Sequence, residues 1–281
     1  MKIRLDIALV EQHLALSREK AKALIMAGVV YVDGQKAYKA GEMIEDGQLI
    51  TVKENLPFVS RGGYKLDKGV KVFGIDLRDK ICIDIGASTG GFTDCMLQNG
   101  AKKVYAVDVG YGQLDWKLRS DERVVVMERI NARYLTREQI PEEADFLSAD
   151  VSFISLNTAL ATAADLLCNT AELMVLIKPQ FEAGRAFVGK KGVVKDKKVH
   201  LDVILRVCEQ MAAKGLSILG LDFSPIKGPE GNIEYLLYMT KRQESSINYK
   251  IKAREITEQS HITLGEGNSY ENRNCYQKTE Y

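Results

Sequence analysis

The chain has 281 residues, of which 46% are hydrophobic and 27% charged, and a formal net charge of +1. This length fits one large domain, or a small domain joined to a medium one. Its five cysteines are scattered and include no Cys-x-x-Cys pair, which disfavours a disulfide scaffold and a zinc site. No apolar run approaches the roughly 18–20 residues that span a bilayer, and residues 1–10 lack the apolar core of a signal peptide. We therefore expect a cytoplasmic protein that is not inserted in a membrane.

Residues 1–54 predict a small α+β domain. Apolar residues at helical spacing occupy 5–14, and a second helix begins after Ser17, a suitable N-cap, and ends at Gly28. Short β-runs at 29–32 and 49–52 follow, and the first of them ends in the turn residues Asp33 and Gly34. Because two helices and a small sheet give a thin core, we expect this domain to rest on an RNA or on a neighbouring domain.

Residues 55–60 are expected to form a linker, and residues 61–242 alternate between β-runs and segments of helix length. The apolar β-runs lie at 81–85, 104–107, 124–127, 146–149, 173–177, 218–221 and 234–239. This alternation predicts an α/β domain with a Rossmann-like, doubly wound sheet of seven strands that is buried on both faces. Residues 243–281 are polar and show no clear period, and we expect them to be disordered.

Two stretches carry a surplus of basic residues on this nearly neutral chain. Residues 178–200 hold seven Lys or Arg against two acids, and residues 61–80 hold six against three. Such stretches suit a polyanion such as RNA, although each taken alone fits a solvated loop equally well.

The most informative stretch is the Gly-rich segment that follows the β-run at 81–85. Asp84 stands near the end of the strand, Gly86 opens a turn, and Gly90 and Gly91 lead into a helix. Ligands of open α/β sheets bind beyond the carboxyl ends of the strands. Glycines there let the backbone approach a ligand closely, and a helix N-terminus offers N–H groups to a carboxylate. The segment therefore predicts a cofactor loop.

Two carboxylates at successive strand ends favour a methyl donor over a nicotinamide cofactor. Nicotinamide enzymes prefer Gly-x-Gly-x-x-Gly, in which a glycine admits the pyrophosphate, whereas this chain has Ala87 and Ser88 there. The charge of Asp84 would repel a pyrophosphate but can pair with the ammonium group of a methionine moiety. Asp108, after the run at 104–107, suits the two hydroxyls of an adenosine ribose. Each carboxylate taken alone is equally well a helix cap or a turn residue.

Four further polar residues stand at strand ends in apolar surroundings: Lys65, Asp150, Lys178 and Glu234. In a doubly wound sheet, Asp150 and Lys178 would follow two strands and point to the same edge as Asp84. A lone lysine is more often a surface residue with a solvated tip. Two lysines and two acids that converge on a cofactor edge instead predict a reacting centre.

These motifs resemble those of the TlyA (haemolysin A) family, in which an S4 RNA-binding domain precedes an FtsJ/RrmJ-like 2′-O-methyltransferase domain. The resemblance covers nearly all of residues 1–242. In the second domain it is carried by residues 60–66 (SRGGYKL), 84–93 (DIGASTGGFT), 108–114 (DVGYGQL), 150–156 (DVSFISL), 178–182 (KPQFE) and 231–235 (GNIEY). In the first domain it is carried by residues 4–6 (RLD), 17–21 (SREKA) and 32–34 (VDG). It also implies that the last strand of the sheet is antiparallel.

The resemblance implies a Lys-Asp-Lys-Glu tetrad and S-adenosyl-L-methionine as the cofactor. This chemistry requires no metal, and the sequence shows no cluster of metal ligands. A ribose 2′-hydroxyl is a weak nucleophile, so transfer needs deprotonation and in-line placement against the methyl sulfonium. Lys178 is the candidate base, because burial and the nearby cation of Lys65 favour its neutral amine. Asp150 would orient Lys178, and Glu234 would position Lys65 or the ribose. The implied cofactor-binding residues are Asp84, Gly86, Ala87, Ser88, Thr89, Gly90, Gly91, Phe92, Asp108 and Asp150.

The substrate that the resemblance implies is ribosomal RNA, at a cytidine of the large subunit and in some members also of the small subunit. No obligate protein partner is evident. Basic side chains would contact phosphates, which positions an RNA rather than reading its sequence. Phe153 would either stack on a target base or lie in the core. The candidate RNA-binding residues are Arg4, Arg18, Lys20, Lys22, Arg61, Phe153, Lys190 and Lys191.

Other interpretations stay open at this point. A non-catalytic RNA-binding or ribosome-assembly factor would keep the fold without turnover, and a methyl-transfer assay separates it from an enzyme. A membrane-active haemolysin is disfavoured, because the sequence has no spanning or strongly amphipathic segment. A pseudouridine synthase would also carry an S4 domain but would need no donor loop.

Overall fold

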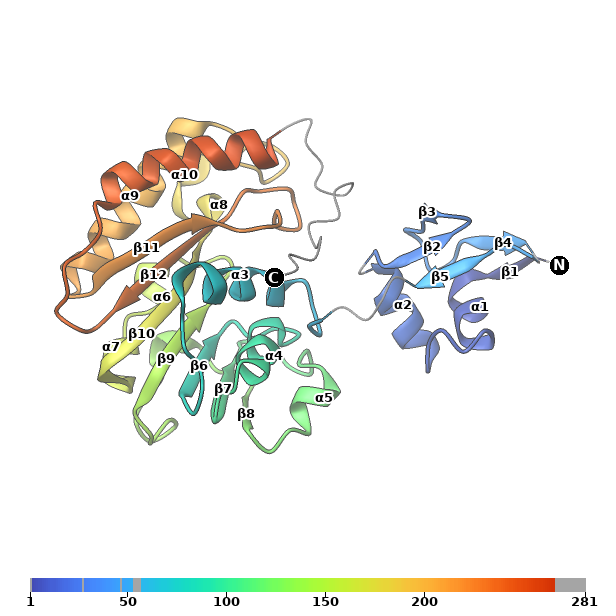
Figure 1. Cartoon of the computed structure of the whole chain (residues 1–281), viewed down its shortest axis with the longest axis horizontal. Helices are drawn as coiled ribbons and strands as arrows, with labels where there is room; N and C mark the ends of the chain where they lie inside the picture. Colours follow the sequence, from blue (N-terminus) through green and yellow to red (C-terminus); the bar gives the residue numbers. More distant parts are fainter. Residues whose placement is uncertain (1, 27, 46, 53–56, 266–281) are drawn as a thin grey trace, which may run out of the picture. The chain divides into compact units, whose positions relative to one another are not determined.

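The computed structural model describes residues 2–26, 28–45, 47–52 and 57–265 of the chain. The chain divides into two compact units, Met1–Arg61 and Gly62–Tyr281 (Figure 1). The predicted linker at 55–60 lies partly outside the described residues.

The first unit packs two helices against two small antiparallel sheets. Its elements are β1 (Lys2–Arg4), α1 (Leu5–Glu11), α2 (Arg18–Met26), β2 (Val30–Val32), β3 (Gln35–Lys36), β4 (Met43–Glu45) and β5 (Ile50–Val52). Strand β1 pairs with β4, and β2 lies between β3 and β5. Ser17 Oγ accepts the Lys20 N–H at 3.2 Å, which fixes the start of α2 as the sequence predicts. Strands β1 and β4 have three residues each and were not predicted.

The second unit contains the large sheet. Its strands are β6 (Ile81–Ile85), β7 (Lys103–Val107), β8 (Val124–Met127), β9 (Ala144–Ala149), β10 (Leu167–Ile177), β11 (Ser217–Phe223) and β12 (Tyr235–Thr240). Its helices are α3 (Gly62–Phe73), α4 (Gly91–Gln98), α5 (Trp116–Arg119), η1 (Ala132–Tyr134), α6 (Leu156–Ala159), α7 (Ala163–Leu166), α8 (Pro179–Glu182), η2 (Arg185–Phe187), α9 (Lys197–Ala213) and α10 (Tyr249–Leu264).

The strand order is β11-β12-β10-β9-β6-β7-β8. Strands β10, β9, β6, β7 and β8 are parallel, and β12 runs antiparallel to both of its neighbours. The predicted seven-stranded, doubly wound sheet with an antiparallel last strand is therefore confirmed. The chain builds outward from β6 to β8 and then returns to place β9 on the other side of β6. Such a reversal opens a crevice at the carboxyl ends of the strands.

Helices cover both faces of this sheet. Successive side chains of a strand point to opposite faces, so each strand contributes side chains to the contacts on both faces. In β6, Ile83 and Ile85 join a buried cluster that includes Val203 of α9 and Ala253 of α10. The intervening Asp84 points to the other face and contacts Thr93 of α4. Figure 1 shows α9 and α10 side by side on the face of the sheet to which Ile83 and Ile85 point.

The prediction of a disordered tail is wrong for its first part, because residues 249–264 form α10. The Asn248 side chain caps this helix by accepting the Ile251 N–H. The buried positions repeat at helical spacing: Ala253, Ile256, Thr257, Ser260 and Leu264. The sequence did not predict this helix because two of its buried positions, Thr257 and Ser260, are polar. Their hydroxyls donate to carbonyl oxygens inside the helix. The predicted tail beyond residue 265 lies outside the described residues.

No helix within the described part of the chain is long and apolar enough to cross a membrane.

Candidate active site

The loop between β6 and α4 brings two strand ends into close approach. Gly86 has a φ of +81°, and a Cβ on it would lie 2.6 Å from the carbonyl oxygen of Asp150. Both the left-handed backbone and this contact oppose any larger residue. The loop ends at Gly90, which has a φ of +95° and is the N-cap of α4. The glycines thus hold the loop tightly against the end of β9.

A cavity of about 550 Å³ opens beyond the ends of β6, β7 and β9. Its wall combines the carboxylates of Asp108 and Asp150 with apolar side chains such as Val109 and Ile130. Four of the predicted cofactor residues line it: Gly86, Ser88, Asp108 and Asp150.

Asp108 connects two loops of the cavity wall. Its Oδ2 accepts the Ser88 N–H at 2.7 Å, and its Oδ1 accepts the Gly110 N–H at 2.7 Å. A carboxylate offers about four acceptor sites, so two backbone donors leave capacity for the hydroxyls of a ligand.

Asp84 is one of the predicted cofactor residues. Its side chain is fully buried beneath the loop, where it accepts from Thr93 Oγ1 at 2.7 Å and from Ser148 Oγ at 2.9 Å. Burial raises the pKa of Asp84 to about 6. The pleat of β6 turns this residue toward α4, and Asp84 is not among the residues that line the cavity. Its pairing with a ligand ammonium group stays a prediction.

The other predicted cofactor residues build the turn and do not line the cavity: Ala87, Thr89, Gly90, Gly91 and Phe92. Sequence reasoning missed Gln113, Ile130 and Asn131, which line it from the loops after β7 and β8. A signal for Asn131 was available, since it stands close behind a β-run that ends at the same edge of the sheet.

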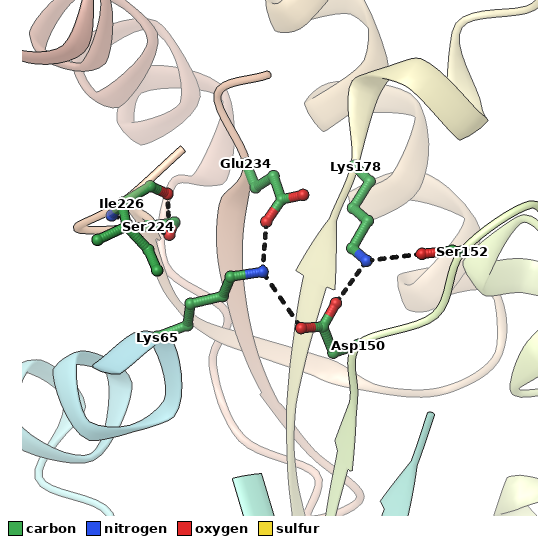
Figure 2. A network of polar contacts seen from close by, with 7 residues as sticks. All are labelled: Lys65, Asp150, Ser152, Lys178, Ser224, Ile226 and Glu234. Carbon is green, nitrogen blue, oxygen red and sulfur yellow. Dashed lines mark hydrogen bonds and ion pairs between the residues drawn. The ribbon is translucent and has the colours of Figure 1, made fainter. Parts of the chain in front are cut away.

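Four charged side chains form an alternating row at this edge (Figure 2). The Lys65 amine lies 2.7 Å from Glu234 Oε2 and 3.2 Å from Asp150 Oδ2. The Lys178 amine lies 2.5 Å from Asp150 Oδ1, and it donates to Ser152 Oγ at 3.1 Å. The structure therefore brings together all four residues of the predicted tetrad, with Asp150 between the two amines. Ser152 joins the row and was not predicted.

The sheet topology explains this convergence. Asp150 and Lys178 directly follow the parallel strands β9 and β10, so both stand at the carboxyl edge. Glu234 directly precedes β12, which is antiparallel and therefore begins where its neighbours end. The pairing of Ile177 with Tyr235 places Lys178 and Glu234 next to each other. Lys65 reaches them from the first turn of α3.

Electrostatics fix the charges of Lys65 and Asp150. Burial disfavours the charge of Lys65, but the carboxylates of Asp150 and Glu234 outweigh it and raise the pKa of Lys65. Burial likewise disfavours the charge of Asp150, but the two lysines outweigh it and lower the pKa of Asp150. Lys65 has two carboxylate partners, whereas Lys178 has one carboxylate and one hydroxyl. Lys178 is therefore the less compensated of the two amines.

The predicted RNA-binding residues include seven basic ones, and the structure leaves all seven side chains at least partly accessible: Arg4, Arg18, Lys20, Lys22, Arg61, Lys190 and Lys191. In the first unit, Arg4 and Arg18 both bind the carboxylate of Asp6. In the second unit, Lys190 and Lys191 lie on the loop between η2 and α9. Their contacts with RNA stay a prediction.

Phe153 is 91% exposed, so its interpretation as a core residue is wrong. Its backbone is left-handed, with a φ of +64°, which is strained for a bulky residue. Its ring centroid lies 5.0 Å from that of Phe181, and the Lys178 amine lies 5.9 Å from the Phe181 ring. The exposed ring therefore stands close to the charged row.

Comparison with known proteins gives matches over both units. The model of the FtsJ-like methyltransferase family matches residues 58–241, and that of the S4 domain matches residues 3–50. YqxC of Bacillus subtilis is 53% identical over 94% of this chain and 96% of its own length. The 16S/23S rRNA (cytidine-2′-O)-methyltransferase TlyA of Mycobacterium tuberculosis is 41% identical over 94% and 98%. A solved structure from Streptococcus thermophilus is 46% identical, with a TM-score of 0.74 over 93% of this chain and 96% of that one.

Proposed function

The chain belongs to the TlyA (haemolysin A) family, an S4 domain joined to an FtsJ-like methyltransferase domain, and on that premise we propose its reaction. It transfers a methyl group from S-adenosyl-L-methionine to the 2′-hydroxyl of a cytidine in ribosomal RNA, in the cytoplasm. The observation that carries the proposal is the alternating row of two lysines and two carboxylates beside the cavity.

The residues around the cavity suit S-adenosyl-L-methionine. Asp108 offers acceptors to the two ribose hydroxyls, and Val109 and Ile130 offer apolar surface to the adenine ring. Asp150 belongs both to the wall of the cavity and to the charged row. The proposed binding site of the methyl donor is therefore next to the residues that would activate the ribose hydroxyl. When bound, the cofactor supplies an electrophilic methyl group on a sulfonium.

Lys178 is the base in this mechanism. Lys65 is held as an ammonium group by two carboxylates and cannot readily accept a proton. As the ribose oxygen attacks the methyl group, its proton moves to the Lys178 amine. The ammonium group that results lies 2.5 Å from Asp150 Oδ1, which stabilises it. Ser152 Oγ, as an acceptor at 3.1 Å, keeps the amine oriented.

Lys65 and Glu234 set the charge and the position of Asp150. Lys65 donates to Asp150 Oδ2 at 3.2 Å and to Glu234 Oε2 at 2.7 Å, so it is fixed between two strand ends. This arrangement favours the first of the two roles considered for Glu234, which is to position Lys65 and not the ribose.

The choice of ribosomal RNA rests on the named activity of the related TlyA and on the surfaces of both units. Methylation of both ribosomal subunits is named for that relative, and for this chain we propose the large subunit and leave the small subunit to the assay below. We propose that a base beside the target ribose stacks on the Phe153 ring, which is exposed and close to the charged row. Such stacking needs an unpaired nucleotide.

The test is transfer of labelled methyl from S-adenosyl-L-methionine to purified ribosomal subunits and to naked ribosomal RNA. We expect label in the RNA with the unchanged protein. The Lys178→Met variant should lose at least ~100-fold in rate while it binds the cofactor as before. Lys214→Met is the matched control, since Lys214 is an exposed lysine at the end of α9, just before β11. Strand β11 begins at the edge of the sheet opposite to the row.

Two outcomes would contradict the proposal in different ways. Full activity of Lys178→Met would exclude Lys178 as the base. Tight cofactor binding without label in any ribosomal substrate would favour a non-catalytic RNA-binding factor or another acceptor.

A further inference from the structure

A buried carboxylate in the first unit joins two arginines that are predicted to bind RNA. Asp6 lies in the first turn of α1 and is 0% exposed. Arg4 donates to it through Nε, at 2.9 Å from Oδ1, and through Nη2, at 3.1 Å from Oδ2. Arg18, the first residue of α2, donates through Nη2 to the same Oδ2 at 3.0 Å. One carboxylate therefore fixes both guanidinium groups.

Both arginines keep donors for a ligand. Their side chains are 43% and 50% exposed, although their partner is completely buried. A guanidinium group has five N–H donors, and Asp6 takes two from Arg4 and one from Arg18. The two Nη2 atoms are no more than about 6 Å apart, because both bind the same oxygen. Two cations so close would repel each other without the carboxylate between them.

The surrounding backbone fixes Asp6 itself. Its N–H donates to the Ala40 carbonyl oxygen at 3.1 Å, and the neighbouring Leu5 N–H donates to the Glu42 carbonyl oxygen at 2.8 Å. The Arg4 guanidinium lies over Gly41 of the same segment, where Nη1 would be 3.4 Å from a Cβ. The arginines are thus held against a rigid support and do not have to be ordered when a ligand binds.

We infer that Asp6 is a positioning residue for RNA binding: it holds Arg4 and Arg18 as one preformed pair of phosphate-binding forks. This inference rests on the proposed function, in which the first unit binds ribosomal RNA. Preordered donors cost less conformational entropy on binding than flexible ones, and an arginine fork matches phosphate geometry. A buried negative charge thereby supports a surface that binds a polyanion.

The charge of Asp6 makes the inference testable with Asp6→Asn in the full chain. If only net charge mattered, loss of a carboxylate would tighten binding to RNA and steepen its salt dependence. Positioning predicts the opposite, namely ~5-fold weaker binding to purified 23S ribosomal RNA and a shallower slope over about 50–200 mM salt. Glu11→Gln is the matched control, since it removes the same charge from an exposed position on the same helix. It should bind RNA at least as tightly as the unchanged protein.

A mutant cycle separates positioning from a merely structural role. If Asp6 acts through the arginines, Asp6→Asn should have no further effect in a protein that already carries Arg4→Gln and Arg18→Gln. Should Asp6→Asn loosen the first unit, as judged by thermal unfolding, Arg18→Lys gives a second test. It keeps the charge and loses the fork, and we expect ~3-fold weaker binding at unchanged net charge.

The outcomes distinguish this inference from the proposed function. Equal or tighter binding by Asp6→Asn, with weaker binding by the protein that carries both Arg4→Gln and Arg18→Gln, would overturn the positioning role alone. An equal loss from Asp6→Asn with and without the arginines would also overturn it. If the unchanged protein and the arginine variants bind RNA equally, the proposed RNA-binding role of the first unit fails instead.

Discussion

Replacement of Asp84 by Asn should stabilise the second unit at neutral pH. Asp84 is fully buried beneath the cofactor loop, where it accepts hydrogen bonds from the hydroxyls of Thr93 and Ser148 and from the Thr93 backbone. These neutral donors do not compensate the buried charge fully, and burial raises the pKa of Asp84 to about 6 from its ordinary 3.8. Asn has the same shape and no charge, so it avoids this cost.

The size and the sign of the effect follow from the two pKa values. Between pH 3.8 and about 6 the folded protein binds the proton of Asp84 more tightly than the unfolded chain does. Stability therefore falls as the pH rises through this window, and the loss is complete above about pH 6. At 1.36 kcal/mol per pKa unit, the full loss is about 3 kcal/mol. The unfolding free energy of Asp84→Asn minus that of the unchanged protein should therefore be about 2 kcal/mol larger at about pH 7.5 than at about pH 4.5.

Urea unfolding followed by tryptophan fluorescence measures this difference. The chain has one tryptophan, Trp116, and it lies in the second unit, so the signal reports on the unit that contains Asp84. Other groups that titrate in this range contribute equally to both proteins and cancel in the comparison. If the difference in unfolding free energy between the two proteins is the same at pH 4.5 and at pH 7.5, the pKa of Asp84 is not raised and the reasoning fails.

Three further substitutions test the site. Glu234→Gln removes one of the two carboxylates that fix Lys65, so the rate of methyl transfer should fall at least ~10-fold while the affinity for the cofactor changes by no more than ~2-fold. A rate near that of the unchanged protein would exclude this role of Glu234. Asp108→Ala removes the acceptors proposed for the ribose hydroxyls and should weaken cofactor binding ~10- to 100-fold by calorimetry, and an unchanged Kd would argue against that contact. Gly86→Ala places a Cβ 2.6 Å from the Asp150 carbonyl oxygen on a left-handed backbone, so binding and transfer should both drop ~10-fold or more, and an alanine variant with normal kinetics would show that the loop tolerates displacement.

The charged row was predictable from the sequence because it depends on strand ends. Each apolar run fixes where a strand stops, and parallel strands stop at one edge, so Asp150 and Lys178 had to meet there. Glu234 and Lys65 were singled out on the same ground, but only the family resemblance implied that the last strand runs in the opposite direction. The prediction that Lys65 stands at a strand end is wrong, because it lies in the first turn of α3.

What the sequence did not predict has physical causes as well. Asp84 precedes Ile85, the last residue of β6, so the pleat of the strand turns its side chain toward α4. The sequence shows that a carboxylate stands near the strand end, but it does not show this direction. Phe153 was assigned partly to the core because phenylalanine is usually buried, whereas its left-handed backbone exposes it. Ser152 and Gln113 carry no signal of their own, because serine and glutamine are common in loops and only the folded chain places them.

Nucleoside mass spectrometry of ribosomal RNA methylated by the purified protein identifies the product of the reaction. We expect 2′-O-methylcytidine, and we expect it to be absent when Lys178→Met replaces the unchanged protein. A methyl group on a base, or on the ribose of another nucleoside, would contradict the proposed reaction.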